Sequence, residues 1–272
     1  MSEMFEFDAY SPREIAQRVE RVGVAKTQLP LLSLAMLGLL AGAFIGLGAL
    51  YSVLITSDQS LSFGTAQLLG GLAFFLGLLL VVVAGAELFT GNNLLAMAWA
   101  DGKITTGSLL TNWLVVCVTN FIVAAGLALL VFYSGHTEMN GGAIGEQYLK
   151  IAAAKCSLPF WQALLRGVLC NILVCMAIWM ALAGRSVVDK AVAIVFPISA
   201  FVAAGFEHSI ANMYFIPMGM LLKVSGGIGS NVDAVSWSGM VSNLVPVILG
   251  NLIGGSVLVG LVYYVIYLRK PA

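Results

Sequence analysis

The sequence predicts an all-α membrane protein whose six transmembrane helices form two inverted three-helix repeats. Three observations support this fold class. Apolar residues make up 60% of the 272 residues and charged residues only 10%, whereas a soluble domain carries about 25% charged residues. Apolar runs long enough to span a bilayer recur along nearly the whole chain. Two of these runs are interrupted by the same spacing of glycine, glutamate and asparagine, which indicates an internal repeat.

Residues 1–28 are polar and are expected to form a cytoplasmic amphipathic segment. Ser11-Pro12-Arg13-Glu14 has the spacing of a helix start, with a serine cap, a proline in the first turn and a glutamate three residues after the cap. Apolar positions then alternate with charges at Ile15, Val19, Val22 and Val24. This pattern predicts a short helix that lies along the membrane surface.

The transmembrane domain is predicted over residues 29–268. Its six segments are expected at about 29–55, 67–100, 108–133, 160–184, 189–223 and 239–268. The second and fifth segments contain polar residues and glycine, so we expect both helices to be broken at the midplane of the membrane. Residues 134–159 form the longest connection, and Gly141-Gly142 predicts that this connection is an irregular loop.

The distribution of lysine and arginine predicts the orientation of the chain. Nine such residues fall on the side of the two termini: Arg13, Arg18, Arg21, Lys26, Lys103, Arg185, Lys190, Arg269 and Lys270. Three fall on the other side: Lys150, Lys155 and Lys223. The positive-inside rule then places both termini in the cytoplasm of a multi-pass protein of the inner (cytoplasmic) membrane. The net charge of zero gives no argument for nucleic acid as a partner.

The internal repeat is defined by short matching segments. Gly85-Ala86-Glu87-Leu88-Phe89-Thr90-Gly91-Asn92 and the segment from Gly205 to Asn212 both read G-x-E-x-x-x-x-N. The next predicted helix of each half carries two asparagines eight residues apart: Asn112 and Asn120, and Asn243 and Asn251. Since each half (about 29–133 and 160–268) has an odd number of spans, the halves should face in opposite directions.

Each break frees backbone groups inside the membrane. We expect four side chains to hydrogen-bond those groups and so support the breaks: Glu87, Asn92, Glu207 and Asn212. The two half-helix N-termini would then point at a shared site, which suits an anion. His208 differs from the rest of the repeat, because the first break has no histidine. Ionisable residues inside a membrane are costly and typically functional.

At these residues the sequence resembles the formate/nitrite transporter family. The resemblance is carried by Phe206–Met213, Leu88-Phe89-Thr90, Cys170–Cys175 and Gly184–Lys190, and it covers essentially the whole chain. It implies an aquaporin-like fold in a homopentamer with one substrate pathway per protomer. It also implies a channel for small monovalent anions such as formate, nitrite, hydrosulfide, lactate or acetate.

The resemblance further implies the residues of the substrate pathway. His208 would be the central pore histidine, Thr90 its hydrogen-bond partner, Asn171 a neighbour of that site, and Lys155 a lysine at the periplasmic mouth. Apolar constrictions would lie at Leu78, Leu88, Phe89, Val174 and Phe201, and Phe74 is a further candidate.

An apolar constriction predicts that the anion crosses with a proton. The idealised cost of moving a bare ion into an apolar medium is on the order of tens of kcal/mol. Protonating a carboxylate whose pKa is about 4 costs only roughly 4 kcal/mol at pH 7. We therefore expect protons as a second transported species, with His208 donating a hydrogen bond or a proton to the anion.

The choice of anion stays open within the family. Phe201–Gly219 resembles the formate branch, whereas Ala154–Phe160 resembles the nitrite or hydrosulfide branches. Formate is the preferred prediction, nitrite or hydrosulfide is the alternative, and a neutral-solute pore is a further one. An intramembrane enzyme is not expected, since the two histidines are far apart in the sequence and the four cysteines lack metal spacing. No metal or cofactor is expected.

Overall fold

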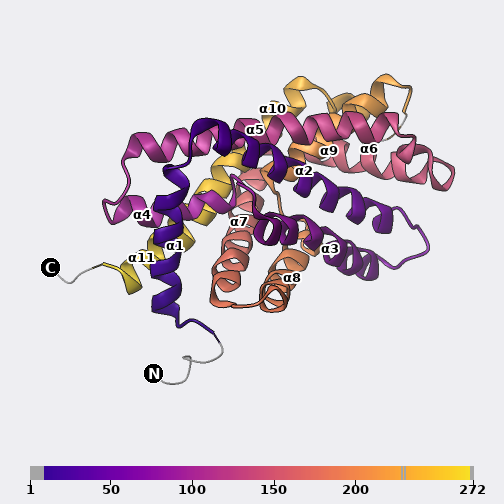
Figure 1. Ribbon diagram of the computed structural model, residues 1–272. Helices are drawn as coiled ribbons and strands as arrows, with labels where there is room; N and C mark the ends of the chain where they lie inside the picture. Colours follow the sequence, from indigo (N-terminus) through magenta and orange to yellow (C-terminus); the bar gives the residue numbers. More distant parts are fainter. Residues whose placement is uncertain (1–8, 228, 230, 270–272) are drawn as a thin grey trace.

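The computed structural model describes residues 9–227, 229 and 231–269, and all regular structure in this part of the chain is helical. The first eight residues of the predicted N-terminal segment lie outside the described residues, as does Lys270, which contributed to the predicted orientation. The first helix, α1 (Pro12–Thr27), and the last, α11 (Val262–Tyr267), lie at the same end of the molecule beside α4 (Ala96–Ala100) (Figure 1).

The start of α1 is capped as predicted. The Ser11 backbone N–H donates to Glu14 Oε2 at 2.8 Å, and Ser11 Oγ accepts from the Glu14 N–H at 3.4 Å. The apolar face of α1, with Ile15, Ala16 and Val19, is buried against the protein. Protein therefore covers this face, and the position of α1 along the membrane surface stays a prediction.

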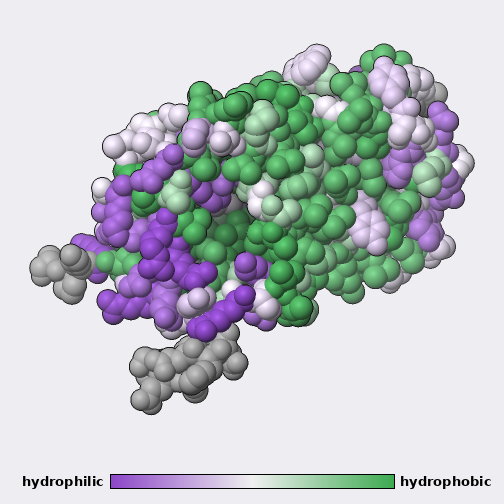
Figure 2. Space-filling model, viewed as in Figure 1, coloured by the Kyte–Doolittle hydropathy of each residue, from purple (hydrophilic) through white to green (hydrophobic). Residues whose placement is uncertain are grey.

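Five helices of the described part are long and apolar enough to cross a membrane. They are α2 (Leu31–Thr56), Phe63–Gly85, α5 (Thr106–Tyr133), α7 (Phe160–Ala183) and Trp237–Tyr267. Phe63–Gly85 comprises α3 (Phe63–Leu80) and a π-helical turn (Val81–Gly85), and Trp237–Tyr267 comprises α10 (Trp237–Leu252), a π-helical stretch (Ile253–Leu261) and α11. The chain is thus a multi-pass membrane protein, and an apolar band covers the middle of its surface between hydrophilic ends (Figure 2).

The second and fifth predicted segments are each interrupted, as the sequence indicates. After the turn that ends at Gly85 the chain leaves the helix, and it resumes as a 3-10 helix (Gly91–Leu95) followed by α4. The fifth predicted segment consists of two shorter helices, α8 (Val187–Ala203) and α9 (Ser209–Val224). Residues 86–90 and 204–208 therefore form two non-helical stretches within the bundle.

The connection between α5 and α7 differs from the prediction of an irregular loop. Left-handed glycines do occur in its first part, at Gly135, Gly141 and Gly142. The rest forms a helix, α6 (Ala143–Cys156), which packs against α9. Tyr148 of α6 is fully buried and its hydroxyl lies 2.8 Å from that of Tyr214 on α9. Residues 144, 148 and 152 recur at helical spacing and form this buried face, and the exposed charged residues Glu146 and Lys150 lie on the other side of the helix.

Close packing between α2 and α5 brings a key asparagine to the first break. A side chain at Gly42 would meet the backbone of Asn120, and one at Gly38 would meet the Thr119 side chain. Because both positions are glycine, the two helices approach closely enough for Asn120 Nδ2 to donate to the Gly38 carbonyl at 2.7 Å.

Candidate functional site

The first break (residues 85–92) begins at Gly85, whose φ of 84° lies in the left-handed region. Asn120 then holds the non-helical backbone on both sides. Its Oδ1 accepts from the Phe89 N–H at 3.0 Å, and its Nδ2 donates to the Glu87 carbonyl at 3.0 Å. The Glu87 N–H donates to the Leu37 carbonyl of α2 at 3.1 Å. Backbone groups freed by the break are thus hydrogen-bonded within the protein.

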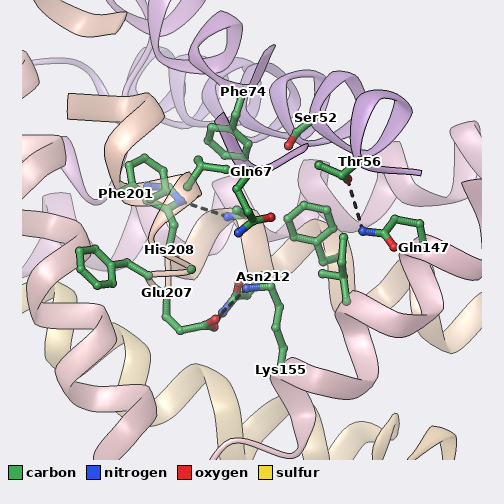
Figure 3. Close-up of a pocket in the computed structure, with 16 residues that line it drawn as sticks. Ser52, Thr56, Gln67, Phe74, Gln147, Lys155, Phe201, Glu207, His208 and Asn212 are labelled. Atoms are coloured by element: carbon green, nitrogen blue, oxygen red, sulfur yellow. Dashed lines mark hydrogen bonds and ion pairs between the residues drawn. The ribbon is translucent and has the colours of Figure 1, made fainter. Parts of the chain in front are cut away.

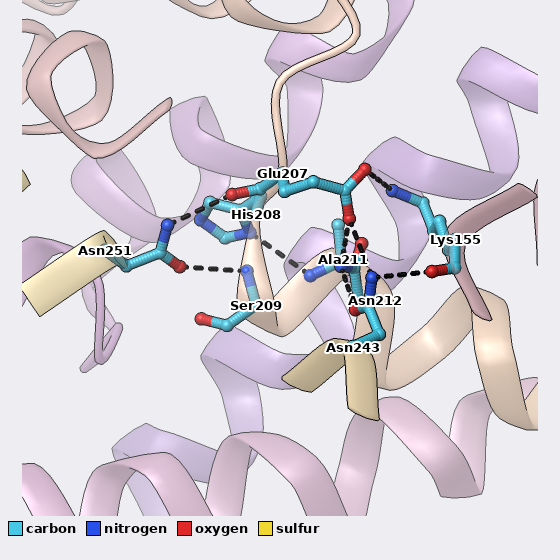
Figure 4. Close-up of polar contacts among 8 residues, drawn as sticks. All are labelled: Lys155, Glu207, His208, Ser209, Ala211, Asn212, Asn243 and Asn251. Carbon is cyan, nitrogen blue, oxygen red and sulfur yellow. Dashed lines mark hydrogen bonds and ion pairs between the residues drawn. The ribbon is translucent and has the colours of Figure 1, made fainter. Parts of the chain in front are cut away.

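The second break (residues 205–212) repeats this arrangement. Gly205 has a φ of 67°. Asn251 Oδ1 accepts from the Ser209 N–H at 3.0 Å, and its Nδ2 donates to the Glu207 carbonyl at 3.0 Å (Figure 4). The Glu207 N–H donates to the Arg166 carbonyl of α7 at 3.3 Å. Asn251 is therefore the counterpart of Asn120, contact by contact.

The glutamate of each break anchors a polar cluster. The side chains predicted to hydrogen-bond the freed backbone, those of Glu87, Asn92, Glu207 and Asn212, bond other side chains in place of that backbone. In the Lys155 cluster (Lys155, Glu207, Asn212 and Asn243), Glu207 Oε1 lies 2.9 Å from Lys155 Nζ, and Glu207 Oε2 accepts from Asn212 Nδ2 at 2.6 Å. Asn212 Nδ2 also donates to Asn243 Oδ1 at 2.7 Å. Glu207 is buried, and so its charge is balanced by Lys155 and by these amide donors.

The Lys26 cluster (Lys26, Glu87, Asn92 and Asn112) matches it. Lys26 Nζ lies 3.0 Å from Glu87 Oε1, and Asn92 Nδ2 donates to Glu87 Oε2 at 2.7 Å and to Asn112 Oδ1 at 2.9 Å. The charge pattern predicted a role for Lys26 in orientation only, and this contact was not predicted. A signal was present, because Lys26-Thr27-Gln28-Leu29-Pro30 and Lys155-Cys156-Ser157-Leu158-Pro159 both read K-x-x-L-P.

His208 joins the two breaks. Its Nδ1 accepts from the Ala211 N–H at 3.1 Å, which makes the imidazole the N-cap of α9. Its Nε2 lies 2.9 Å from Thr90 Oγ1 of the first break. Since a backbone N–H can only donate, Nδ1 is the acceptor. A neutral imidazole then carries its proton on Nε2, and this N–H donates a hydrogen bond to Thr90 Oγ1. The ring of Phe201 stacks on the imidazole with centroids 5.8 Å apart.

Asn171 lies behind Thr90. Its Nδ2 is within hydrogen-bond distance of the Thr90 carbonyl at 3.2 Å, Asn93 Oδ1 at 2.7 Å and the Asn251 carbonyl at 2.7 Å. The Asn171 side chain is completely buried, and it does not line the cavities around His208. This geometry fixes the backbone that presents Thr90.

A cavity lies on each side of the His208–Thr90 contact. The Lys155 cavity, of about 180 Å³, contains Lys155, Glu207 and His208 in its lining (Figure 3). The Lys26 cavity, of about 520 Å³, contains Lys26, Glu87 and Asn92. Between them lies an apolar space with no volume for a water molecule, lined by Ile45, Phe74, Leu78, Leu88, Val174, Ile198, Phe201 and His208.

Five of the six predicted constriction residues thus surround one dry space. The sixth, Phe89, is buried but is not in its lining, and its N–H is held by Asn120. Ile45 and Ile198 complete the lining and were not predicted. Among the described residues, no cluster of three or more His, Cys, Asp or Glu side chains could hold a metal ion. The chemistry available at the centre is therefore hydrogen bonding by His208 and Thr90 between two lysine-containing cavities.

Comparison with known proteins gives consistent results. The profile of the formate/nitrite transporter family matches residues 13–265. The formate channel FocA of Escherichia coli strain K12 is 40% identical over 275 residues, covering 97% of this chain and 96% of FocA. A pentameric formate channel with formate bound has a TM-score of 0.82 at 37% identity, covering 88% of this chain and 98% of its own. An FNT family ion channel has a TM-score of 0.83 at 29% identity, covering 95% and 99%.

Proposed function

Because this chain belongs to the formate/nitrite transporter family, we propose that it carries formate across the cytoplasmic membrane together with a proton. Its relatives include formate channels, which are transport proteins and not enzymes. The observation that carries the proposal is the His208–Thr90 hydrogen bond, which lies beside the dry apolar space and between two lysine-containing cavities.

The matching contacts of the two breaks support an inverted repeat. Each half contributes a lysine-bearing helix (α1 or α6), an unbroken span, a broken span and a final span, in the same order. An aquaporin-like arrangement of six spans follows if the two halves are related by a two-fold axis in the membrane plane. A homopentamer with one pathway per protomer is proposed by similarity to the pentameric formate channel.

In this proposal the pathway runs through the Lys155 cavity, past His208 and Thr90, into the Lys26 cavity. Phe74, Leu78, Leu88, Val174 and Phe201 form its dry section. Phe89 and Asn171 support the backbone beside it, through Asn120 and the Thr90 carbonyl. The excess of lysine and arginine on the side of the termini places Lys26 on the cytoplasmic side and Lys155 on the periplasmic side.

The dry section explains why a proton should travel with the anion. A formate ion would lose its water shell there, whereas formic acid is small and neutral. The Nε2–H of His208 can donate to a formate oxygen in place of Thr90, and the Thr90 hydroxyl can rotate to donate as well. His208 therefore stabilises the anion next to the dry section, where a proton joins it before it crosses.

The alternative substrates are nitrite and hydrosulfide, whose small size and single charge suit the same path. A neutral-solute pore is a further alternative. It is disfavoured by the lysines in both cavities, since a neutral molecule gains no electrostatic attraction from them.

Purified protein in liposomes tests the proposal. Uptake of labelled formate should rise as external pH falls from 7.5 to 6, and nitrite, hydrosulfide and lactate should be tested as competitors. His208→Phe should abolish the pH-dependent part of the flux and leave the pentamer intact on size-exclusion chromatography. Formate uptake that is independent of pH in both proteins would overturn the proton-linked mechanism, and absence of formate uptake would overturn the choice of substrate.

A further inference from the structure

The two cavities differ in the wall that faces their lysine clusters. In the Lys155 cavity, Thr56 on α2 and Gln147 on α6 lie on the opposite side from Glu207 and His208, and Gln67 of α3 lies between Phe74 and Lys155 (Figure 3). These three side chains form what we call the amide wall. All three are partly exposed and line the cavity.

The amide wall retains unused hydrogen-bond donors. Within the described residues, Gln147 Nε2 has one partner, Thr56 Oγ1 at 3.4 Å, and Gln67 Nε2 has one partner, the Ala203 carbonyl at 3.1 Å. Each amide nitrogen carries two N–H groups, so each has a second one available. Lys155 Nζ carries three N–H groups. In the described part of the chain its one hydrogen-bond partner is Glu207, and it also lies 5.6 Å from the centre of the Phe215 ring.

The Lys26 cavity shows that the architecture of a break does not require such a wall. It contains the same lysine, glutamate and asparagine contacts, but its remaining lining is almost entirely apolar, including Leu37, Val82, Ile178 and Leu182. The two cavities thus have matching clusters, but only the Lys155 cavity has a polar wall opposite its cluster. The amide wall therefore needs a different explanation, such as the recognition of a solute.

We propose that Thr56, Gln67 and Gln147, together with Lys155, form a binding subsite that a carboxylate occupies before it passes His208. A carboxylate has two oxygens that accept hydrogen bonds from different directions, so Lys155 can bind one while the amide wall binds the other. Hydrosulfide offers a single acceptor atom and spans less of the distance between the two sides than two carboxylate oxygens do. The subsite rests on the proposed function and adds a preference for carboxylates over hydrosulfide.

Transport kinetics in proteoliposomes test the subsite. For Gln147→Leu and Gln67→Leu, we expect the apparent KM for formate to rise about threefold each, as for the loss of one hydrogen bond, with Vmax unchanged. The KM for hydrosulfide should stay within about twofold of the wild-type value, because the single acceptor atom of hydrosulfide gains less from the amide wall. Gln59→Leu, on the exposed loop after α2, makes the same chemical change outside the cavity and should alter neither value.

A second variant separates binding from a structural role. Gln147→Glu keeps the shape of the side chain and its contact with Thr56, whose hydroxyl can donate to the new carboxylate. If Gln147 only ties α6 to α2, the added negative charge raises the KM for formate and for hydrosulfide by the same factor. If it binds the carboxylate, the lost amide donor adds to this repulsion, and the KM for formate rises about tenfold, more than the KM for hydrosulfide does.

The outcomes are distinguishable. Unchanged formate KM in all three variants, or equal changes for formate and hydrosulfide, would overturn the subsite and leave the proposed function intact. If the unchanged protein carries hydrosulfide but no formate, both the subsite and the choice of substrate are overturned.

Discussion

The two breaks share a framework, and among the positions where they differ are two residues that face each other across the contact. Gly85 and Gly205 turn the chain, the glutamates two residues later each pair with a lysine, and Asn120 and Asn251 hold the same backbone groups. Within this framework His208 occupies the position of Leu88, and Thr90 occupies the position of Ile210. The shared residues thus build the breaks, and the different residues provide the polar contact between them.

This comparison clarifies the role of the adjacent pair Glu207 and His208. A carboxylate beside an imidazole inside a membrane suggests a catalytic or transport pair. In the structure the two side chains point in different directions. The Glu207 carboxylate points to Lys155 (Figure 4), whereas His208 Nε2 lies 2.9 Å from Thr90 Oγ1. Glu207 has a counterpart in Glu87, whereas the first break has no second histidine. Glu207 therefore belongs to the shared framework, and His208 belongs to the polar contact between the breaks.

The largest effect should come from removing an asparagine that supports a break. Asn120→Leu and Asn251→Leu each lose bonds to one backbone N–H and two backbone carbonyls. Unsatisfied buried groups cost about 1–3 kcal/mol each, so we expect a loss of about 3 kcal/mol or more in either variant. The melting temperature in detergent, followed by size-exclusion chromatography, should fall steeply and to a similar extent. A large fall in only one variant would show that the two breaks are not built alike.

A change that makes the second break resemble the first should separate transport from stability. In His208→Leu, the imidazole is replaced by the residue found at the equivalent Leu88. Formate uptake should fall about a hundredfold, the scale of a positioned proton donor or acceptor. Stability should fall by about 2 kcal/mol, less than in the asparagine variants, through loss of the cap bond from the Ala211 N–H and of the bond to Thr90 Oγ1. Uptake near the unchanged level would assign His208 to the framework.

Much of the framework could be predicted from the sequence because its signals are short and local. The repeated G-x-E-x-x-x-x-N located both breaks, and the spacing from Ser11 to Glu14 located the start of α1. The helix α6 could not be predicted in the same way. In the sequence its buried residues are separated by charged ones such as Glu146 and Lys150, so no continuous apolar run marks the helix. Its burial also depends on α9, which lies more than 50 residues away along the chain.

Side-chain pairing over long distances was also beyond local patterns. Lys26 and Glu87 are 61 residues apart, and their contact becomes apparent only when α1 is placed across the first break. The amphipathic pattern of α1 correctly predicted a helix with an apolar face. It could not tell whether lipid or protein covers that face, because both are apolar environments.

The hydrogen bond between the halves should have an intermediate effect. Thr90→Val keeps the shape of the side chain and removes the acceptor of the His208 Nε2–H. We expect formate uptake to fall about tenfold, since a hydrogen bond in a buried site contributes about 1 kcal/mol or somewhat more. Thr90→Ser should restore most of the activity. Ile210→Val, at the equivalent position of the second break, serves as the control and should change uptake less than twofold, so equal losses at both positions would point to packing alone.

The smallest effect should come from neutralising a lysine cluster. Each lysine is already paired with a glutamate, so its attraction for an anion is partly cancelled. The double variant Lys155→Gln/Glu207→Gln leaves no buried charge alone, and Lys26→Gln/Glu87→Gln is its counterpart. We expect each double variant to raise the apparent KM about threefold when the anion enters through the cavity that holds the changed residues. The KM for transport in the opposite direction should rise less. Flux measured in both directions across vesicles of uniform orientation checks this. A KM that rises equally in both directions would mean that the two clusters only support their breaks and do not attract the anion.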